Sequence, residues 1–157
     1  MRIAPSYRAS SPALILLVDD NHDGVVARRS VLEELGYRVV PACSGPDALI
    51  HVEQQEFDLI ITDYKMVPMD GLELISHLRK NEFQKPIILL SGFADSLGLR
   101  EELTGANVVI QKSANEITQL VRSTKRLLTA PKKPAGSQRT AKGGDLRKRA
   151  AGAQSGQ

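Results

Sequence analysis

The sequence predicts an α/β domain in which five parallel strands form a doubly wound sheet. Between residues 13 and 130, short continuous apolar runs alternate with longer segments of helical periodicity. Continuous apolar runs are typical of strands that are buried on both faces, and the helices between them provide the crossovers that parallel strands require. The expected strands are residues 13–18, 37–41, 57–62, 87–90 and 107–110.

Four of the helices between and after these strands are expected from apolar side chains at helical spacing. The fourth helix in chain order, near residues 96–103, contains Gly98 and few apolar side chains, so we expect it to be the least stable element. The apolar stripes of the other four are Val25, Leu32 and Leu35; Ala48, Leu49 and Val52; Leu74, Ile75 and Leu78; and Ile117, Leu120, Val121, Leu127 and Leu128.

Charge is distributed unevenly along the 157 residues, and this predicts three segments. Residues 13–130 carry 12 basic and 17 acidic side chains, a net charge of −5, and are the expected folded domain. Residues 131–157 carry a net +6 and one large aliphatic side chain, which is too little to offset the entropy of ordering the chain. We therefore expect a disordered basic tail there and a flexible leader over residues 1–12.

Composition also argues against several classes of protein. The longest aliphatic run, residues 13–18, has six residues, whereas roughly 20 are needed to span a bilayer, so we expect a cytoplasmic protein without membrane insertion. Cys43 is the only cysteine, which excludes an internal disulfide and a cysteine-based metal cluster, and we expect it to be a small buried residue.

Polar side chains follow four of the five predicted strands. Asp19 and Asp20 follow the first strand, Asp63 the third, Ser91 the fourth and Lys112 the fifth. Right-handed crossovers place the carboxyl ends of parallel strands at one edge of the sheet, so these side chains should converge. Individually, each has an ordinary structural explanation as a helix cap, a turn residue or a solvated charge. Their joint occurrence at successive strand ends favours a functional site.

The expected site has the groups required for phosphoryl transfer to a carboxylate. Three clustered carboxylates repel one another, and a hard divalent cation such as Mg²⁺ would neutralise them and keep positions free for phosphoryl oxygens. A carboxylate beside such an ion can accept a phosphoryl group as an acyl phosphate. An ammonium and a hydroxyl at fixed points would then stabilise the phosphoryl oxygens, and Lys112 and Ser91 are of those types.

These residues resemble the receiver domains of two-component response regulators. The matching segments, within residues 13–128, are Ile-Leu-Leu-Val-Asp-Asp-Asn at 15–21, Leu-Ile-Ile-Thr-Asp at 59–63 with Met66 and Met-Asp-Gly at 69–71, Leu-Leu-Ser-Gly at 89–92, and Val-Ile-Gln-Lys at 109–112. The resemblance implies a flavodoxin-like (βα)₅ fold with strand order 2-1-3-4-5.

The resemblance also implies a role for each matched residue. Asp63 would be the phosphoacceptor and Asp20 a direct Mg²⁺ ligand, while Asp19 would act partly through water. The backbone carbonyl of Lys65 would complete the protein ligands. Ser91 would contact the phosphoryl group, and Lys112 would pair with its oxygens.

The chain departs from the family pattern at four positions. Val67 replaces the usual proline, which here is Pro68, and Gly92 follows Ser91 where alanine is common. Val109 stands where the family usually has a switch aromatic, and Ser113 where it usually has a proline. None of these changes removes a chemical group from the site, so we expect them to affect the output switch rather than phosphorylation.

The predicted function is that of a stand-alone receiver, which is phosphorylated by a histidine kinase or phosphotransfer protein and signals through a protein partner. Its chemistry would be limited to its own phosphorylation and dephosphorylation, so we do not expect an enzyme with a separate substrate. One alternative is a phosphorylation-independent adaptor that keeps a relic site. Another is weak polyanion binding through the basic tail, without sequence-specific nucleic-acid recognition. His22, His51 and His77 lack ligand spacing and are expected to be surface residues.

Overall fold

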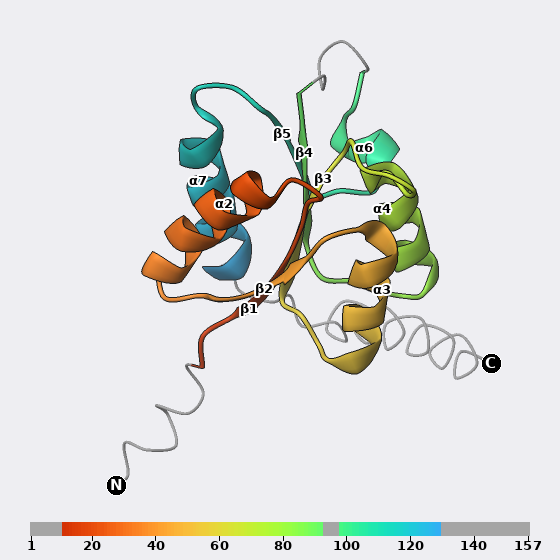
Figure 1. Cartoon of the computed structure of the whole chain (residues 1–157), viewed down its shortest axis with the longest axis horizontal. Helices are drawn as coiled ribbons and strands as arrows, with labels where there is room; N and C mark the ends of the chain where they lie inside the picture. The colour runs from red at the N-terminus through yellow and green to blue at the C-terminus, as the bar shows by residue number, and fades with distance from the viewer. Residues whose placement is uncertain (1–10, 93–97, 130–157) are drawn as a thin grey trace, which may run out of the picture.

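The computed structural model describes residues 11–92 and 98–129, and within them it contains one parallel sheet (Figure 1). The strand order is β2-β1-β3-β4-β5, which confirms the predicted fold class and topology. All four neighbouring pairs are parallel. The predicted strand bounds differ from the observed ones by at most two residues. The strands are β1 (Leu14–Val18), β2 (Arg38–Ala42), β3 (Leu59–Asp63), β4 (Ile87–Ser91) and β5 (Val108–Gln111).

Helices connect the strands and follow the last one, and several begin at a capping side chain. The Asn21 side chain accepts a hydrogen bond from the Gly24 N–H, and the Ser44 hydroxyl oxygen accepts one from the Asp47 N–H. Asp70 and Glu73 cap each other's backbone N–H groups, a reciprocal arrangement that satisfies two donors at the helix start. The helices are α2 (His22–Glu34), α3 (Gly45–Gln54), α4 (Gly71–Lys80), α6 (Glu101–Thr104) and α7 (Glu116–Thr129).

The helices cover both faces of the sheet. Figure 1 shows α2 and α7 together on one side and α3, α4 and α6 on the other. Alternate residues of β1 enter different cores: Leu16 packs in the core that includes Leu74 and Leu78 of α4, whereas Leu17 packs in the core that includes Leu32 and Leu120. Because both faces are covered, β1, β3 and β4 are buried along their whole length, and they are apolar except for Thr62, Asp63 and Ser91 near their carboxyl ends.

Some local predictions need correction. Leu35 and Ile117, expected in buried stripes, are exposed, because each lies near a helix terminus. In the predicted fourth helix, residues 98–100 are not helical and α6 covers only Glu101–Thr104, while residues 96 and 97 lie outside the described residues. Cys43 is exposed, so its predicted burial is wrong; it lies in the turn before α3, where its N–H donates to Asp47.

The ends of the chain lie largely outside the described residues. Only residues 11 and 12 of the predicted leader (residues 1–12) are described, and the predicted tail (131–157) lies entirely outside the described residues. Both segments therefore stay predictions. Within the described ranges, no helix is both long and apolar enough to cross a membrane.

Strand β2 forms one edge of the sheet and contains a proline. The Arg38 N–H donates to the Ala13 carbonyl, and the Ala42 carbonyl accepts from the Asp19 N–H. Backbone groups alternate in direction along a strand, so Pro41 faces away from β1. Its lack of an N–H therefore costs the sheet no hydrogen bond, and this explains why a proline is accommodated in this strand.

Candidate phosphoacceptor site

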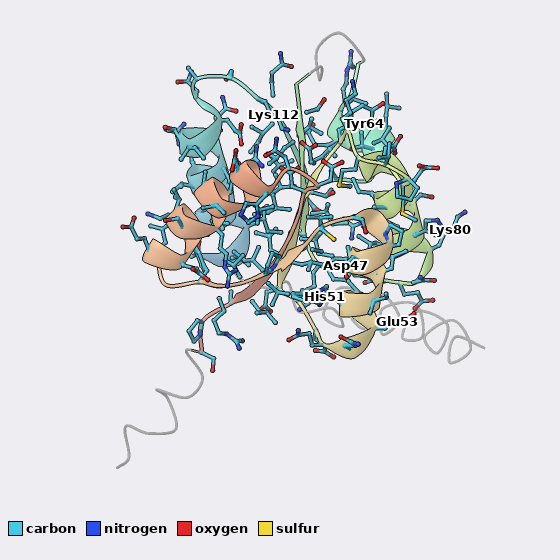
Figure 2. All side chains as sticks on the ribbon, viewed as in Figure 1. Asp47, His51, Glu53, Tyr64, Lys80 and Lys112 are labelled. Carbon is cyan, nitrogen blue, oxygen red and sulfur yellow. The ribbon has the colours of Figure 1, made fainter. Side chains whose placement is uncertain are left out.

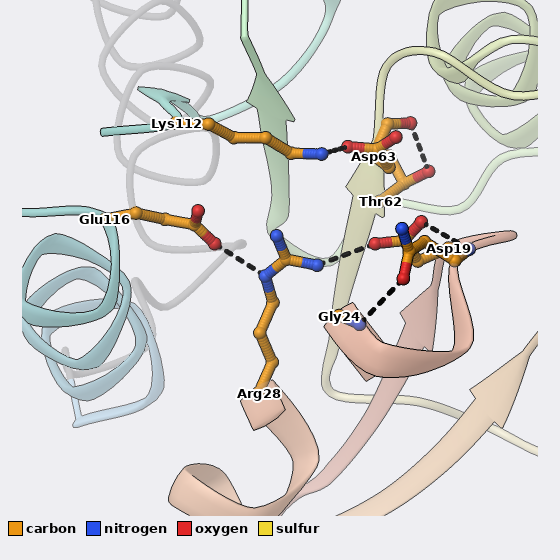
Figure 3. Close-up of polar contacts among 8 residues, drawn as sticks. Asp19, Gly24, Arg28, Thr62, Asp63, Lys112 and Glu116 are labelled. Atoms are coloured by element: carbon orange, nitrogen blue, oxygen red, sulfur yellow. Dashed lines mark hydrogen bonds and ion pairs between the residues drawn. The ribbon is translucent and has the colours of Figure 1, made fainter. Parts of the chain in front are cut away.

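The carboxyl ends of four strands meet at one edge of the sheet and bring the predicted site residues to it. Asp19 follows β1 directly, Asp63 is the last residue of β3 and Ser91 is the last residue of β4. Lys112 follows β5, and its N–H donates to the Ser91 carbonyl at 2.9 Å. Figure 3 shows the Lys112 side chain extending toward Asp63 across this edge.

Three carboxylates cluster at this edge. Asp19, Asp20 and Asp63 each offer an oxygen, and these oxygens lie within 4.8 Å of one another. Asp19 and Asp63 are buried, with 3% and 4% exposure, whereas Asp20 is exposed. A set of carboxylate oxygens that is partly open to solvent suits Mg²⁺, which binds one or two carboxylates and keeps several waters. The donor set therefore fits the cation that the sequence predicted.

The surroundings of Asp63 have opposing effects on the pKa of its carboxyl group. Burial raises the pKa of its carboxyl group, and repulsion from Asp19 raises it further. The hydrogen bond and charge of Lys112, and the charge of Arg28, act in the opposite direction. Lys112 forms an ion pair with Asp63 Oδ1. The carboxylate is therefore destabilised by its surroundings and depends on nearby positive charge.

The structure adds a residue that the sequence interpretation missed, Arg28 of α2. Its Nη1 donates to Asp19 Oδ2 at 2.6 Å, and its Nε donates to Glu116 Oε2 at 2.6 Å (Figure 3). Burial alone would lower the pKa of Arg28, but the ion pairs with Glu116 and Asp19 raise it, so the guanidinium stays charged. A buried arginine thus bridges the acidic cluster and the first turn of α7.

The sequence contained a signal for Arg28. It lies three residues after Val25 and four before Leu32, on the stripe assigned to the buried face of this helix. A charged residue in the middle of an apolar stripe needs a buried partner. No comparable signal identified Glu116 as that partner, because it lies 88 residues away in sequence and pairing at that separation depends on the fold.

Two other predicted site residues, Ser91 and Lys65, lie at or after the carboxyl ends of β4 and β3. Ser91 is buried at the carboxyl end of β4, next to β3, and its contact with a phosphoryl group stays a prediction. Lys65 lies in the loop after β3 with an exposed side chain, and the role of its carbonyl stays a prediction.

The three histidines form no metal cluster in the part of the chain that is described, and two of them are surface residues as expected, whereas His51 is half-buried. His22 and His77 are exposed. His51 lies on α3, 3.8 Å from Asp47 and on the opposite side of the sheet from α2 and α7 (Figure 2).

Comparison with known proteins identifies the family. The model of the response regulator receiver domain matches residues 15–123. The chain belongs to this family. Among solved structures, the receiver domain of a sensor histidine kinase from Pseudomonas aeruginosa, with a magnesium ion in its active-site cleft, has a TM-score of 0.69 and 28% identity and covers 76% of this chain and 99% of that one. Response regulator TrrA from Thermotoga maritima, in complex with Mg²⁺-BeF, has a TM-score of 0.66 and 30% identity, covering 73% and 98%.

Curated relatives contain the receiver domain as part of longer proteins. The gliding motility regulatory protein of Myxococcus xanthus is 30% identical over 116 residues, which are 72% of this chain and 15% of that protein. The transcriptional regulatory protein PhoP of Bacillus subtilis is 36% identical over 77 residues, 49% of this chain and 32% of that protein. Receiver domains thus occur in proteins of different overall function, and the family alone does not identify the partner.

Proposed function

We propose that this receiver domain accepts a phosphoryl group on Asp63 from the phosphohistidine of a histidine kinase or phosphotransfer protein. The observation that carries the proposal is a buried carboxylate at the end of β3, ion-paired with Lys112 and within reach of two further carboxylates. An Asp63 oxygen attacks phosphorus, a P–O bond forms and the P–N bond to the imidazole breaks. The electron pair of that bond returns to the imidazole nitrogen, and Asp63 becomes an acyl phosphate.

The residues around Asp63 have complementary tasks in this proposal. Asp19, Asp20 and Asp63, with the Lys65 carbonyl, would hold Mg²⁺, which when bound neutralises negative charge on the phosphoryl oxygens. Lys112 moves its ion pair from the carboxylate to a phosphoryl oxygen. The Ser91 hydroxyl, which is buried on the adjacent strand, donates to another phosphoryl oxygen and reports its presence.

We further propose that the domain acts in the cytoplasm and signals through contacts with a protein partner. Its chemistry would be confined to the phosphorylation and dephosphorylation of Asp63, without a separate substrate. Support comes from the family, whose members include domains of sensor kinases and of transcriptional regulators.

Intact mass spectrometry after incubation with acetyl phosphate and Mg²⁺ tests the proposal. We expect the full chain to gain the mass of one phosphoryl group and Asp63→Asn to gain none. Asp58→Asn is a matched control, because Asp58 lies just before β3 and its acceptor for the Leu14 N–H is kept by asparagine. Labelling of a folded Asp63→Asn protein would show that a different residue is the acceptor. No labelling of the native chain would favour the adaptor hypothesis.

A further inference from the structure

We propose that Arg28 is a fixed internal cation of the phosphoacceptor site, a positioning residue that holds Asp19 and weakens the binding of a divalent cation to the acidic cluster. This inference rests on the proposed function, because it assumes that the cluster of Asp19, Asp20 and Asp63 binds Mg²⁺.

The first observation is that both oxygens of Asp19 already accept hydrogen bonds. Oδ1 accepts from the Asn21 N–H at 2.9 Å, and Oδ2 accepts from Arg28 Nη1 at 2.6 Å. The Arg28 contact is a charge-assisted hydrogen bond with a buried partner, which is the stronger kind. A cation, or a water molecule on that cation, must therefore compete with a guanidinium for Oδ2.

The second observation is that the position of the guanidinium is fixed from several sides. Glu116 of α7 accepts from Arg28 Nε, so the side chain is held at two points. A Cβ at Gly24 would lie 2.9 Å from Arg28 Nη1 and 3.0 Å from Asp19 Oδ2, so the contact needs a glycine in the first turn of α2. Because the Arg28 side chain is 8% exposed, water screens its charge only weakly.

These contacts change the charge that a divalent cation encounters. Three carboxylates alone would attract Mg²⁺ strongly, but Arg28 offsets Asp19 and Lys112 offsets Asp63. The guanidinium would also repel the incoming ion across a short distance through a poorly solvated region. Asp20, which is exposed, is the one carboxylate of the three without a cationic partner among the ion pairs of the described residues.

A purely structural role for Arg28 is the competing explanation. In that case its function is to join α2 to α7 through Glu116, and loss of either residue would loosen the site and weaken Mg²⁺ binding. The cation hypothesis makes a different prediction. Removal of the Arg28 charge should tighten Mg²⁺ binding, whereas removal of the Glu116 charge leaves the guanidinium less neutralised and should weaken it.

Isothermal titration of the full chain with Mg²⁺ separates these explanations. We expect Arg28→Gln to bind Mg²⁺ about ten-fold more tightly than the native chain, a change that corresponds to a modest difference in charge interaction energy. Arg28→Lys, which keeps the charge, should stay near the native affinity, and Glu116→Gln should bind more weakly. Arg29→Gln is the matched control, because Arg29 is the next residue of α2 and forms an exposed ion pair with Glu33.

Two further measurements keep the test decisive. Circular dichroism checks the fold of each variant, and Arg28→Met, which keeps the apolar stem of the side chain, replaces Arg28→Gln if the latter unfolds. Equal or weaker Mg²⁺ binding by folded Arg28→Gln or Arg28→Met overturns the inference, and so does the absence of Mg²⁺ binding by both the native chain and these two variants. Labelling by acetyl phosphate is measured in parallel: tighter Mg²⁺ binding without labelling of Asp63 would contradict the proposed function but support the inference.

Discussion

At the scale of single residues, the chemistry of the site depends on a carboxylate placed where it is poorly solvated. Asp63 is buried, and it lies near Asp19, so its ionised form is less stable in the folded chain than in the unfolded one. Such a group lowers the stability of the protein whenever it is charged. The same instability makes Asp63 responsive to positive charge, whether from Lys112, Arg28 or a bound cation.

Asp63→Asn should therefore stabilise the metal-free protein at neutral pH. The raised pKa of Asp63 means that its destabilising effect is absent well below the ordinary value of 3.8, appears as the pH rises through the window above that value and is complete above the folded-state pKa. Urea denaturation at pH 7 and near pH 4 measures the free energy of unfolding. We expect the gain from Asp63→Asn to be larger at pH 7, and an equal gain at both pH values would contradict this explanation.

Gly24→Ala should destabilise the protein, although alanine usually favours a helix by up to about 1 kcal/mol over glycine. The new methyl group would meet the guanidinium of Arg28 and the carboxylate of Asp19, and it would displace the ion pair. A double-mutant cycle with Arg28→Gln checks the cause. In that background the contact is relieved, so the same Gly24→Ala change should cost less or become stabilising; an unchanged cost would place the strain elsewhere.

At the scale of secondary-structure elements, local sequence signals determine where the helices begin. The clearest case is α4, in which Asp70 and Glu73 each cap the other's backbone N–H. The helix follows the loop from Asp63, so its first turn defines how that loop leaves the site. The Gly71 N–H donates to the Tyr64 carbonyl at 2.8 Å, which closes the loop next to Asp63.

Asp70→Ala should lower the free energy of unfolding by about 1 kcal/mol, the usual cost of losing an N-cap side chain. Glu73→Gln is the matched control, since glutamine still completes the reciprocal cap and should change the stability by much less. Thermal denaturation followed by circular dichroism compares the two variants. Equal losses would show that the charge of Glu73, rather than the cap geometry, stabilises the start of α4.

Elements were predicted well where one physical signal dominates. All five strands lie within two residues of their predicted bounds, and for β1, β3 and β4 the reason is that an apolar run buried on both faces has few alternatives. The site residues Asp19, Asp63 and Lys112 followed from the strand ends, and the structure brings them together. The Arg28–Glu116 pair was not predicted, because it joins two helices that become neighbours only when both pack on the same face of the sheet.

At the scale of the whole molecule, the site connects to elements of unequal stability. On one side of the sheet, the buried ion pairs of Arg28 connect α2 to Asp19 and to Glu116 of α7. On the other side, the segment after Ser91 contains Gly98 in a left-handed conformation and leads to α6, which has four residues. A short helix with few buried side chains opens more easily than a long one, so the two sides should respond differently to phosphorylation.

Phosphorylation should change hydrogen exchange mainly over residues 91–104. We expect the Ser91 hydroxyl to move toward the phosphoryl oxygens and to pull the segment that follows it, whereas Val109 lacks the ring that would usually follow such a movement. Exchange measured by mass spectrometry, with and without acetyl phosphate and with Asp63→Asn as the unlabelled control, tests this expectation. Larger changes in α2 than in residues 91–104 would contradict it.

Pro41 in β2 has a consequence for the protein in a crowded solution. An exposed sheet edge can recruit a strand from another molecule and so begin fibre growth. At Pro41 the outward position has no N–H to offer, so an incoming strand would lose a hydrogen bond in the middle of the new ladder. Pro41 therefore removes no hydrogen bond from the sheet itself, and it makes the exposed edge of β2 a poorer template for aggregation.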